Sequence, residues 1–235
     1  MNFLEDTTIV VVHGAWADGS SWQAVIRALQ EKGLRVVAAP LPLTSLSEDA
    51  SALRRTLART QGQVIVAGHA YAGAVIATAH DERVKALVYV AALAPDEGET
   101  VAQVFYRDEP HPQAPKLAPD ADGLIWMPES GFDQAFAQNA TAEQIALSKA
   151  VQRPIALKSI QEAAPAPAWK SKPTWYLLAE QDRMINPKTQ RFMAERMKAN
   201  VRSFAVDHTP LLTAPEKVVD IIFEAATATV QPAAA

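Results

Sequence analysis

The chain has 235 residues, 49% of them hydrophobic and 20% charged, with a formal net charge of −4 at pH 7 and no cysteine. This length and apolar content suit one large globular domain. Disulfides and thiolate chemistry are excluded, no Lys/Arg cluster favours a nucleic-acid partner, and no apolar run is long enough to span a membrane. Because the sequence also starts without a basic, apolar leader, we expect a cytoplasmic protein.

Short β-branched runs alternate with helical patterns through the first 93 residues. Strands are predicted over 7–14, 34–40, 63–69 and 84–93, with helices over 20–33, 44–60 and 71–80 between them. The first helix repeats apolar residues along one face: Trp22, Val25, Ile26 and Leu29. This alternation predicts an α/β fold with a mostly parallel central sheet and helices on both of its faces.

The alternation stops between residues 96 and 172, a Pro-rich segment with helix-like pieces at 141–153 and 154–164. A structureless loop of this length is implausible in a compact domain, so we interpret the segment as an inserted, largely helical cap. Strands are predicted again over 172–182 and 201–206, followed by helices over 187–199 and 214–226. The prediction is therefore a single domain, residues 1–235, with a cap at 96–172 inserted in it.

The stretch Gly68-His69-Ala70-Tyr71-Ala72 lies where a predicted strand turns into a helix. In a nucleophile elbow, G-x-S-x-G, such a turn holds the central side chain up on a strained backbone. The context fits, but the pattern fits only in part, because Ala70 stands at the serine position and Ala72 at the last glycine. A plain strand–turn–helix with small residues for packing is the alternative interpretation.

The stretch His13-Gly14-Ala15-Trp16 directly follows the first predicted strand. An acyl-transfer site needs two N–H donors directed at the developing oxyanion. One comes from the residue after the nucleophile, here Tyr71, and the other from a loop after an early strand, for which Ala15 is the best candidate. We expect His13, Gly14, Trp16 and Tyr71 to contact the substrate, the alternative being a glycine turn on which Trp16 simply packs.

Asp182 and His208 each follow a late predicted strand. A histidine that acts as a base needs a carboxylate on its far nitrogen, and sites in open α/β sheets form at the carboxyl ends of the strands. We assign Asp182 as that carboxylate and His208 as the base. The neighbouring Glu180 and Asp207 are interpreted as solvated loop charges.

Taken together, "VVVHGAWADGSSW", "GHAYAGAVIATA", "LLAEQDRMINP" and "DHTPLLTAPEKV" resemble the α/β-hydrolase superfamily. More narrowly, they are similar to small bacterial esterase-like members related to plant methylesterases and hydroxynitrile lyases. The resemblance implies Asp182 as the acid of a catalytic triad, His208 as its base, and the Ala15 and Tyr71 N–H groups as the oxyanion hole. It implies neither a metal nor an organic cofactor. The departure is Ala70, where these relatives carry the nucleophilic serine.

Three hypotheses account for Ala70, because an alanine methyl cannot form an acyl-enzyme. The first is an ester hydrolase whose serine was replaced by engineering. The second is a natural enzyme in which His208 and Asp182 act directly on substrate or water, as a lyase or a direct hydrolase. The third is a small-ligand-binding protein without catalysis. The second off-pattern position, Ala72, favours natural divergence, whereas the retained His208 and Asp182 favour remaining chemistry.

The expected ligand is a small hydrophobic or aromatic ester or acyl compound, bound in an apolar pocket. The predicted cap contains large apolar side chains that either pack it onto the sheet or line this pocket: Phe105, Tyr106, Trp126, Met127, Phe132 and Phe136. Of these, Trp126 is assigned to the substrate site. No metal site is predicted.

Overall fold

A computed structural model describes residues 6–230 of the chain. Six strands form one sheet in the order β2-β1-β3-β4-β7-β8, and every neighbouring pair is parallel. The strands are β1 Thr7–Val12, β2 Arg35–Ala39, β3 Gln63–His69, β4 Val84–Val90, β7 Thr174–Ala179 and β8 Asn200–Phe204. The predicted α/β fold with a mostly parallel sheet is thus confirmed.

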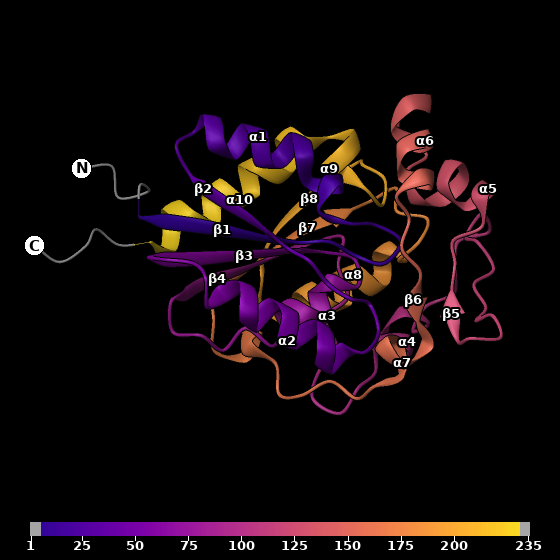
Figure 1. Ribbon diagram of the computed structural model, residues 1–235, viewed down its shortest axis with the longest axis horizontal. Helices are drawn as coiled ribbons and strands as arrows, with labels where there is room; N and C mark the ends of the chain where they lie inside the picture. Colours follow the sequence, from indigo (N-terminus) through magenta and orange to yellow (C-terminus); the bar gives the residue numbers. More distant parts are fainter. Residues whose placement is uncertain (1–5, 231–235) are drawn as a thin grey trace, which may run out of the picture.

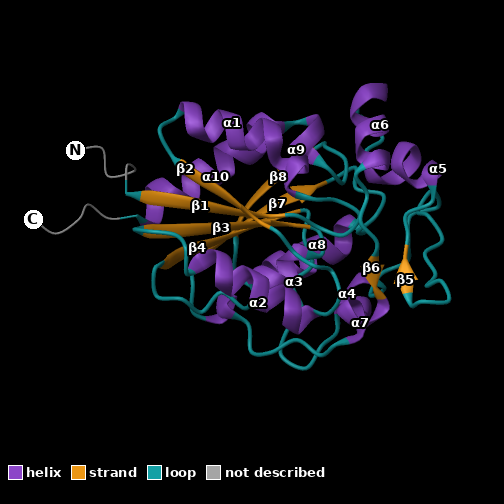
Figure 2. Cartoon of the chain, in the orientation of Figure 1, coloured by secondary structure: helices purple, strands orange, loops and turns teal. Residues whose placement is uncertain are grey.

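Helices cover both faces of this sheet (Figures 1 and 2). On one face lie α1 Gln23–Glu31, α9 Pro210–Thr213 and α10 Pro215–Thr229. On the other lie α2 Leu46–Leu57, α3 Ala72–Ile76 and α8 Pro187–Arg196. A 3-10 turn, Gly19–Trp22, precedes α1. The helix predicted over 71–80 is shorter than expected, because the chain leaves α-helical geometry after α3 and continues in turns.

The sheet is buried on both sides because its strands are apolar at almost every position. Ile9 and Val11 of β1 pack with α1 and α10, whereas Val10 and Val12 pack on the opposite face with α2 and α3. All four side chains are fully buried. A parallel sheet sandwiched between helix layers requires such continuous hydrophobic strands, rather than an alternation of apolar and polar residues.

The segment 96–172 leaves the sheet after β4 and returns to it at β7. It contains α4 Val101–Phe105, α5 Glu129–Gly131, a π-helical turn Phe132–Phe136, α6 Ala142–Ala150, α7 Leu157–Gln161 and a 3-10 turn Ala168–Lys170. A short antiparallel pair, β5 Leu124–Ile125 and β6 Ile155–Ala156, was not predicted, because two residues are too few to show a periodicity. Figure 1 shows β5, β6, α4 and α7 beyond the carboxyl ends of the sheet strands.

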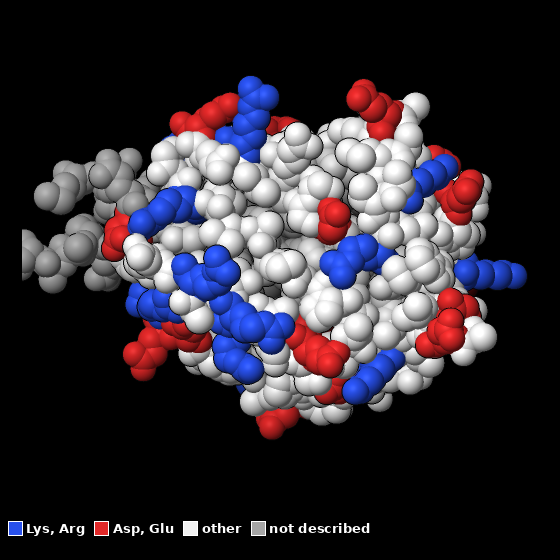
Figure 3. Space-filling model, viewed as in Figure 1, with Lys and Arg blue, Asp and Glu red and all other residues white. Residues whose placement is uncertain are grey.

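Charged side chains of both signs are interspersed on the face shown in Figure 3, with uncharged areas between them. Within residues 6–230, no helix is both long and apolar enough to cross a membrane. The expectation of a start without a basic, apolar leader concerns residues 1–5 in part, and these residues lie outside the described part of the chain.

Candidate active site

The turn from β3 to α3 has the backbone of a nucleophile elbow. Ala70 has a φ of +51°, a left-handed conformation that costs an L-residue about 1–2 kcal/mol. Two hydrogen bonds fix the turn, because the Ala70 carbonyl accepts the N–H groups of Leu93 at 2.9 Å and Gly73 at 3.1 Å. Non-glycine residues held in this conformation concentrate at functional sites. The strained backbone therefore favours the elbow interpretation over a plain strand–turn–helix.

Close packing around the elbow explains the altered glycine pattern. A Cβ added to Gly68 would lie 2.9 Å from Ile76 Cγ2, and one added to Gly73 would lie 2.2 Å from the Leu93 carbonyl oxygen. Both positions therefore exclude a side chain. Ala72, by contrast, is fully buried with its methyl group accommodated. The close contact between α3 and the chain after β4 thus falls at position 73 rather than 72.

The His13–Trp16 loop is held against the elbow from the side of β1. A Cβ on Gly14 would lie 3.1 Å from the Ala70 methyl carbon, so a glycine lets this loop approach closely. His13 Nε2 accepts the Leu41 N–H at 3.1 Å, and its Nδ1–H donates to the Gly14 carbonyl at 2.9 Å. Both ring nitrogens are therefore occupied. His13 and Gly14 do not line the cavity described below, so they position the loop instead of contacting a ligand there.

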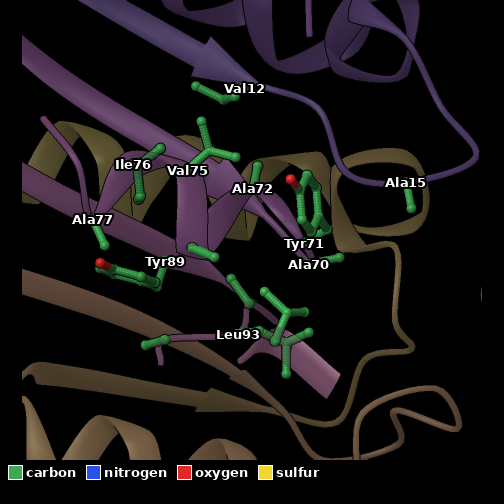
Figure 4. Close-up of a cluster of buried hydrophobic side chains, with 14 of the residues drawn as sticks. Val12, Ala15, Ala70, Tyr71, Ala72, Val75, Ile76, Ala77, Tyr89 and Leu93 are labelled. Carbon is green, nitrogen blue, oxygen red and sulfur yellow. The ribbon is translucent and has the colours of Figure 1, made fainter. Parts of the chain in front are cut away.

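Two backbone N–H groups at this junction are free to bind an anion. Neither the Ala15 nor the Tyr71 N–H donates to any acceptor within residues 6–230, and both residues line the same cavity. Figure 4 shows Ala15 on the loop that leaves β1 after Val12, and Ala70 and Tyr71 at the turn into α3. Unpaired N–H donors beside the elbow have the placement that an oxyanion hole requires.

Asp182 and His208, which are 26 residues apart in sequence, form a buried pair. His208 Nδ1–H donates to Asp182 Oδ2 at 2.8 Å, and both side chains are at most 2% exposed. The other Asp182 oxygen accepts the N–H groups of Met184 at 2.7 Å and Ile185 at 2.9 Å. Because Nδ1 carries the proton, Nε2 is the basic nitrogen of a neutral His208, as an acid–base catalyst requires.

Gln190, on α8, also binds Asp182 of this pair, and the sequence did not identify it as a site residue. Its side-chain N–H donates to Asp182 Oδ2 at 2.7 Å, while its Oε1 accepts the Ala179 N–H at 3.0 Å. The carboxylate therefore accepts four hydrogen bonds, which compensate for its burial. No local motif marks Gln190, because its role depends on how α8 packs against β7.

The expectation that Asp207 is a solvated loop charge is wrong. Asp207 is fully buried rather than solvated. Its carboxylate accepts the Thr209 N–H at 3.2 Å, the Thr213 hydroxyl at 2.6 Å and the Asn139 N–H at 3.0 Å. These bonds hold the loop that carries His208, so Asp207 organises that loop. Glu180 is exposed, as expected.

His69, at the end of β3, supports His208 through its backbone. The Nε2–H of His69 donates to the His208 carbonyl at 2.7 Å, and the two ring centroids are 4.8 Å apart. Burial, together with the nearby His208 imidazole, lowers the pKa of His69 to about 3. His69 is thus neutral at physiological pH and serves as a hydrogen-bond donor to the backbone.

An apolar cavity of about 220 Å³ opens onto the elbow. Ala15, Trp16, Ala70, Tyr71 and His208 form its base. The segment 96–172 contributes most of the remaining wall: Val101, Ala102, Phe105, Tyr106, Leu117, Pro119, Ile125, Ile155, Leu157, Ile160 and Gln161. The cavity is below the ~300–1,000 Å³ of pockets that hold drug-sized ligands, so it suits a small apolar group.

Tyr71 lines this cavity, but its hydroxyl group faces away into a polar network. The hydroxyl donates to Asp49 Oδ2 at 2.6 Å, and Asp49 Oδ1 accepts the Leu43 N–H at 2.7 Å. Burial raises the pKa of Asp49 to about 6, although these two donors oppose the rise. The phenol therefore anchors Tyr71, whose backbone N–H has no acceptor within residues 6–230.

The structure brings most of the predicted site residues together, but it separates Trp126 from them. Trp126 is 46% exposed and its indole N–H donates to Asp120 Oδ2 at 3.2 Å. It does not line the cavity, because β5 directs Ile125 inward and the next residue outward. Of the other aromatic candidates, Phe105 and Tyr106 line the cavity, whereas Phe132 and Phe136 are buried and do not line it. The aliphatic wall residues were not singled out, since they carry no chemical signal.

Comparison with known proteins gives one family match along the sequence. A model of the "Alpha/beta hydrolase family" matches residues 9–221. The chain is also 29% identical to a pyrethroid hydrolase of Sphingobium wenxiniae over 123 residues. That alignment covers 46% of this chain and 44% of the pyrethroid hydrolase, so it spans less than half of the relative's length.

Solved structures show the same fold over nearly the whole chain. A pyrethroid hydrolase from Sphingobium faniae superposes with a TM-score of 0.82 and 24% identity, covering 94% of this chain and 98% of the other. Polyneuridine aldehyde esterase gives 0.81 at 17% identity, with 93% and 98% covered. A variant of tomato methylketone synthase I gives 0.82 at 16% identity, with 95% and 98% covered.

Proposed function

Because this chain belongs to the alpha/beta hydrolase family, we propose that its site is a carboxylic-ester hydrolase site of the serine type in which Ala70 occupies the nucleophile position. Its ligand is a small hydrophobic or aromatic ester or acyl compound. The observation that carries the proposal is the left-handed backbone of Ala70, set beside two unpaired N–H groups and the buried His208–Asp182 pair. The named hydrolases among its relatives support the same chemistry.

Each residue has a defined role in this chemistry. A serine at position 70 would attack the ester carbonyl and pass its proton to His208 Nε2, while Asp182 stabilises the resulting imidazolium. The Ala15 and Tyr71 N–H groups would bind the oxyanion. With alanine at position 70 the attack cannot occur. Loss of the serine lowers kcat by about 10⁶-fold in a Ser-His-Asp hydrolase, so the chain as it stands is severely impaired in this reaction.

The direct test is Ala70→Ser, assayed with p-nitrophenyl acetate and butyrate. We expect kcat/KM to rise by at least about 10³-fold, because one oxygen atom completes a preorganised site. The double variant Ala70→Ser/His208→Ala is the matched control and should return to the rate of the parent chain. If Ala70→Ser folds and remains inactive toward both esters, the serine-hydrolase assignment is wrong.

A second candidate is general-base chemistry without a covalent intermediate, as a direct hydrolase or a lyase. It is favoured by His208 Nε2, which has no hydrogen-bond partner within residues 6–230 although His208 lines the cavity. Any turnover by the unmodified chain should then disappear in His208→Ala, and unchanged turnover would exclude this mechanism. Saturable binding of an ester without product formation would instead indicate the third hypothesis, a ligand-binding protein.

A further inference from the structure

A second, larger hollow lies beside the ester cavity. It has a volume of about 580 Å³ and runs between α1 and α6. Its walls include polar side chains from both helices, among them Gln23 and Arg27 on α1 and Gln144 and Ser148 on α6. We call it the α1–α6 groove. Its walls are therefore more polar than those of the apolar ester cavity.

A thin aromatic partition separates the groove from the cavity. His69 and Phe136 line the groove, whereas Ala70 and His208 line the cavity. The Phe136 ring lies against His208 with centroids 5.4 Å apart and meets Trp16 edge-on at 6.3 Å. Within residues 6–230, Trp16 is the one residue that lines both hollows. Trp16 thus stands between the two hollows, with Phe136 packed beside it.

Trp16 is held rigidly in this place. Its indole N–H donates to the Ile125 carbonyl at 2.9 Å and its backbone N–H donates to the Arg153 carbonyl at 3.1 Å. Both acceptors belong to the segment 96–172, so the ring is fixed from the side of the ligand as well as by the β1 loop. The side chain is 9% exposed. A large ring whose only N–H is satisfied, on a backbone that is also hydrogen-bonded, has little freedom to move aside.

We propose that Trp16 is the size-selecting wall of the ester site. Its ring ends the 220 Å³ cavity on the side of the α1–α6 groove and keeps larger acyl or alcohol groups from extending into that groove. Replacing the ring with a methyl group joins the two hollows. This inference deepens the proposed function and rests on it, since the cavity is taken as the place where the ester binds.

The absence of cysteine allows a test that needs no ester hydrolysis. In the variant Ala70→Cys, the single thiol faces the cavity and reports which reagents can reach it. The rates of alkylation by N-ethylmaleimide and by the larger N-(1-pyrenyl)maleimide are measured with Trp16 intact, with Trp16→Ala and with Trp126→Ala. The last variant is the matched control, because Trp126 also donates its indole N–H within the protein but lines neither hollow.

We expect Trp16→Ala to raise the pyrenyl-to-ethyl rate ratio at least about tenfold, and Trp126→Ala to leave it within about twofold. Using a ratio removes changes in the reactivity of the thiol itself. Trp16→Phe, which keeps most of the packing, should give an intermediate ratio, and it replaces Trp16→Ala in the test if Trp16→Ala does not fold.

An unchanged rate ratio in folded Trp16 variants would contradict the proposal that Trp16 forms the size-selecting wall. So would a thiol that reacts with neither reagent, since residue 70 would then not face an open cavity. Failure of the ester assay on Ala70→Ser is a separate result and concerns only the proposed chemistry.

Discussion

The polar contacts beneath the elbow show how individual residues stabilise the geometry of the candidate site. The buried Asp49 carboxylate accepts hydrogen bonds from the Tyr71 hydroxyl and the Leu43 N–H. Leu43 itself has a φ of +61°, so its backbone is strained in the same way as that of Ala70. A buried carboxylate that loses one of its donors retains the full penalty of desolvation. The Tyr71 hydroxyl is therefore expected to be important for stability, although it does not face the ligand.

The corresponding prediction concerns Tyr71→Phe. It should lower the free energy of unfolding by about 1–3 kcal/mol, because Asp49 Oδ2 loses its 2.6 Å partner. Urea denaturation at pH 7.5 measures the change. Tyr89→Phe is the control, since the Tyr89 hydroxyl is buried with no hydrogen-bond partner in the described chain, and its removal should leave the free energy of unfolding unchanged or raise it. Equal effects of the two variants would show that the Asp49 contact contributes nothing.

At the scale of elements, the site depends on how closely α3 approaches the chain that follows β4. The Leu93 N–H reaches the Ala70 carbonyl, and the backbone of this chain passes directly over Gly73. The position of α3 thus fixes both the elbow and the direction of the Tyr71 N–H. Since α3 has only five residues, its packing rather than its intrinsic helix propensity determines where it lies.

We predict that Gly73→Ala disturbs this contact. The added methyl group would lie 2.2 Å from the Leu93 carbonyl oxygen and 2.9 Å from Ala92 Cβ. Overpacking of this kind destabilises a protein by about 1–3 kcal/mol or more. Gly19→Ala, whose methyl would lie 3.2 Å from Ala38 Cβ and touch nothing closer, should cost less than about 1 kcal/mol. Thermal and urea unfolding of both variants check the difference, and a neutral Gly73→Ala would contradict the close approach.

At the scale of the whole molecule, His69 connects two segments at the carboxyl ends of the strands that are far apart in the sequence. It ends β3, and its ring N–H bonds to the His208 carbonyl beyond β8. The folded protein holds His69 neutral, with its pKa lowered to about 3, whereas the unfolded chain protonates it near 6.5. The unfolded state therefore binds more protons between these values. Stability contributed by His69 is complete above pH 6.5 and is lost as the pH falls toward 3.

The low pKa of His69 in the folded protein predicts a pH-dependent difference in stability between the parent chain and His69→Gln. Glutamine keeps a donor for the His208 carbonyl but does not titrate, so the parent should lose about 1 kcal/mol more than the variant between pH 6.5 and 5.5. Urea unfolding at the two pH values measures the loss.

Asp49 does not affect this comparison. Its raised pKa favours the folded state as the pH falls from 6 to 4, but it contributes equally to both proteins. His80→Gln, at an exposed histidine that bonds to the Ala166 carbonyl, should follow the parent. Parallel pH slopes for parent and His69→Gln would contradict the buried neutral histidine.

Much of this architecture could be predicted because it depends on local patterns. The β-branched runs and the apolar face of the first helix identify strands and helices directly. Asp182 and His208 could be assigned because each follows a strand, and the carboxyl ends of parallel strands meet at one edge of a sheet. Asp207 was misinterpreted for a related reason, since nothing beside it in the sequence reveals its partners Asn139 and Thr213.

The sequence by itself determined the chain order of the six sheet strands, the position of the turn after β3 and the identity of the residue at that turn, because these depend on neighbours a few positions apart. Only the tertiary structure decided that Ala70 adopts a left-handed backbone, that Gln190 completes the Asp182 pair, and that Trp126 lies outside the cavity while Trp16 lines it. These properties arise where segments up to about 140 residues apart come into contact, as His69 does with His208. Burial and hydrogen-bond geometry at such contacts depend on the packing of whole elements, which no local pattern encodes.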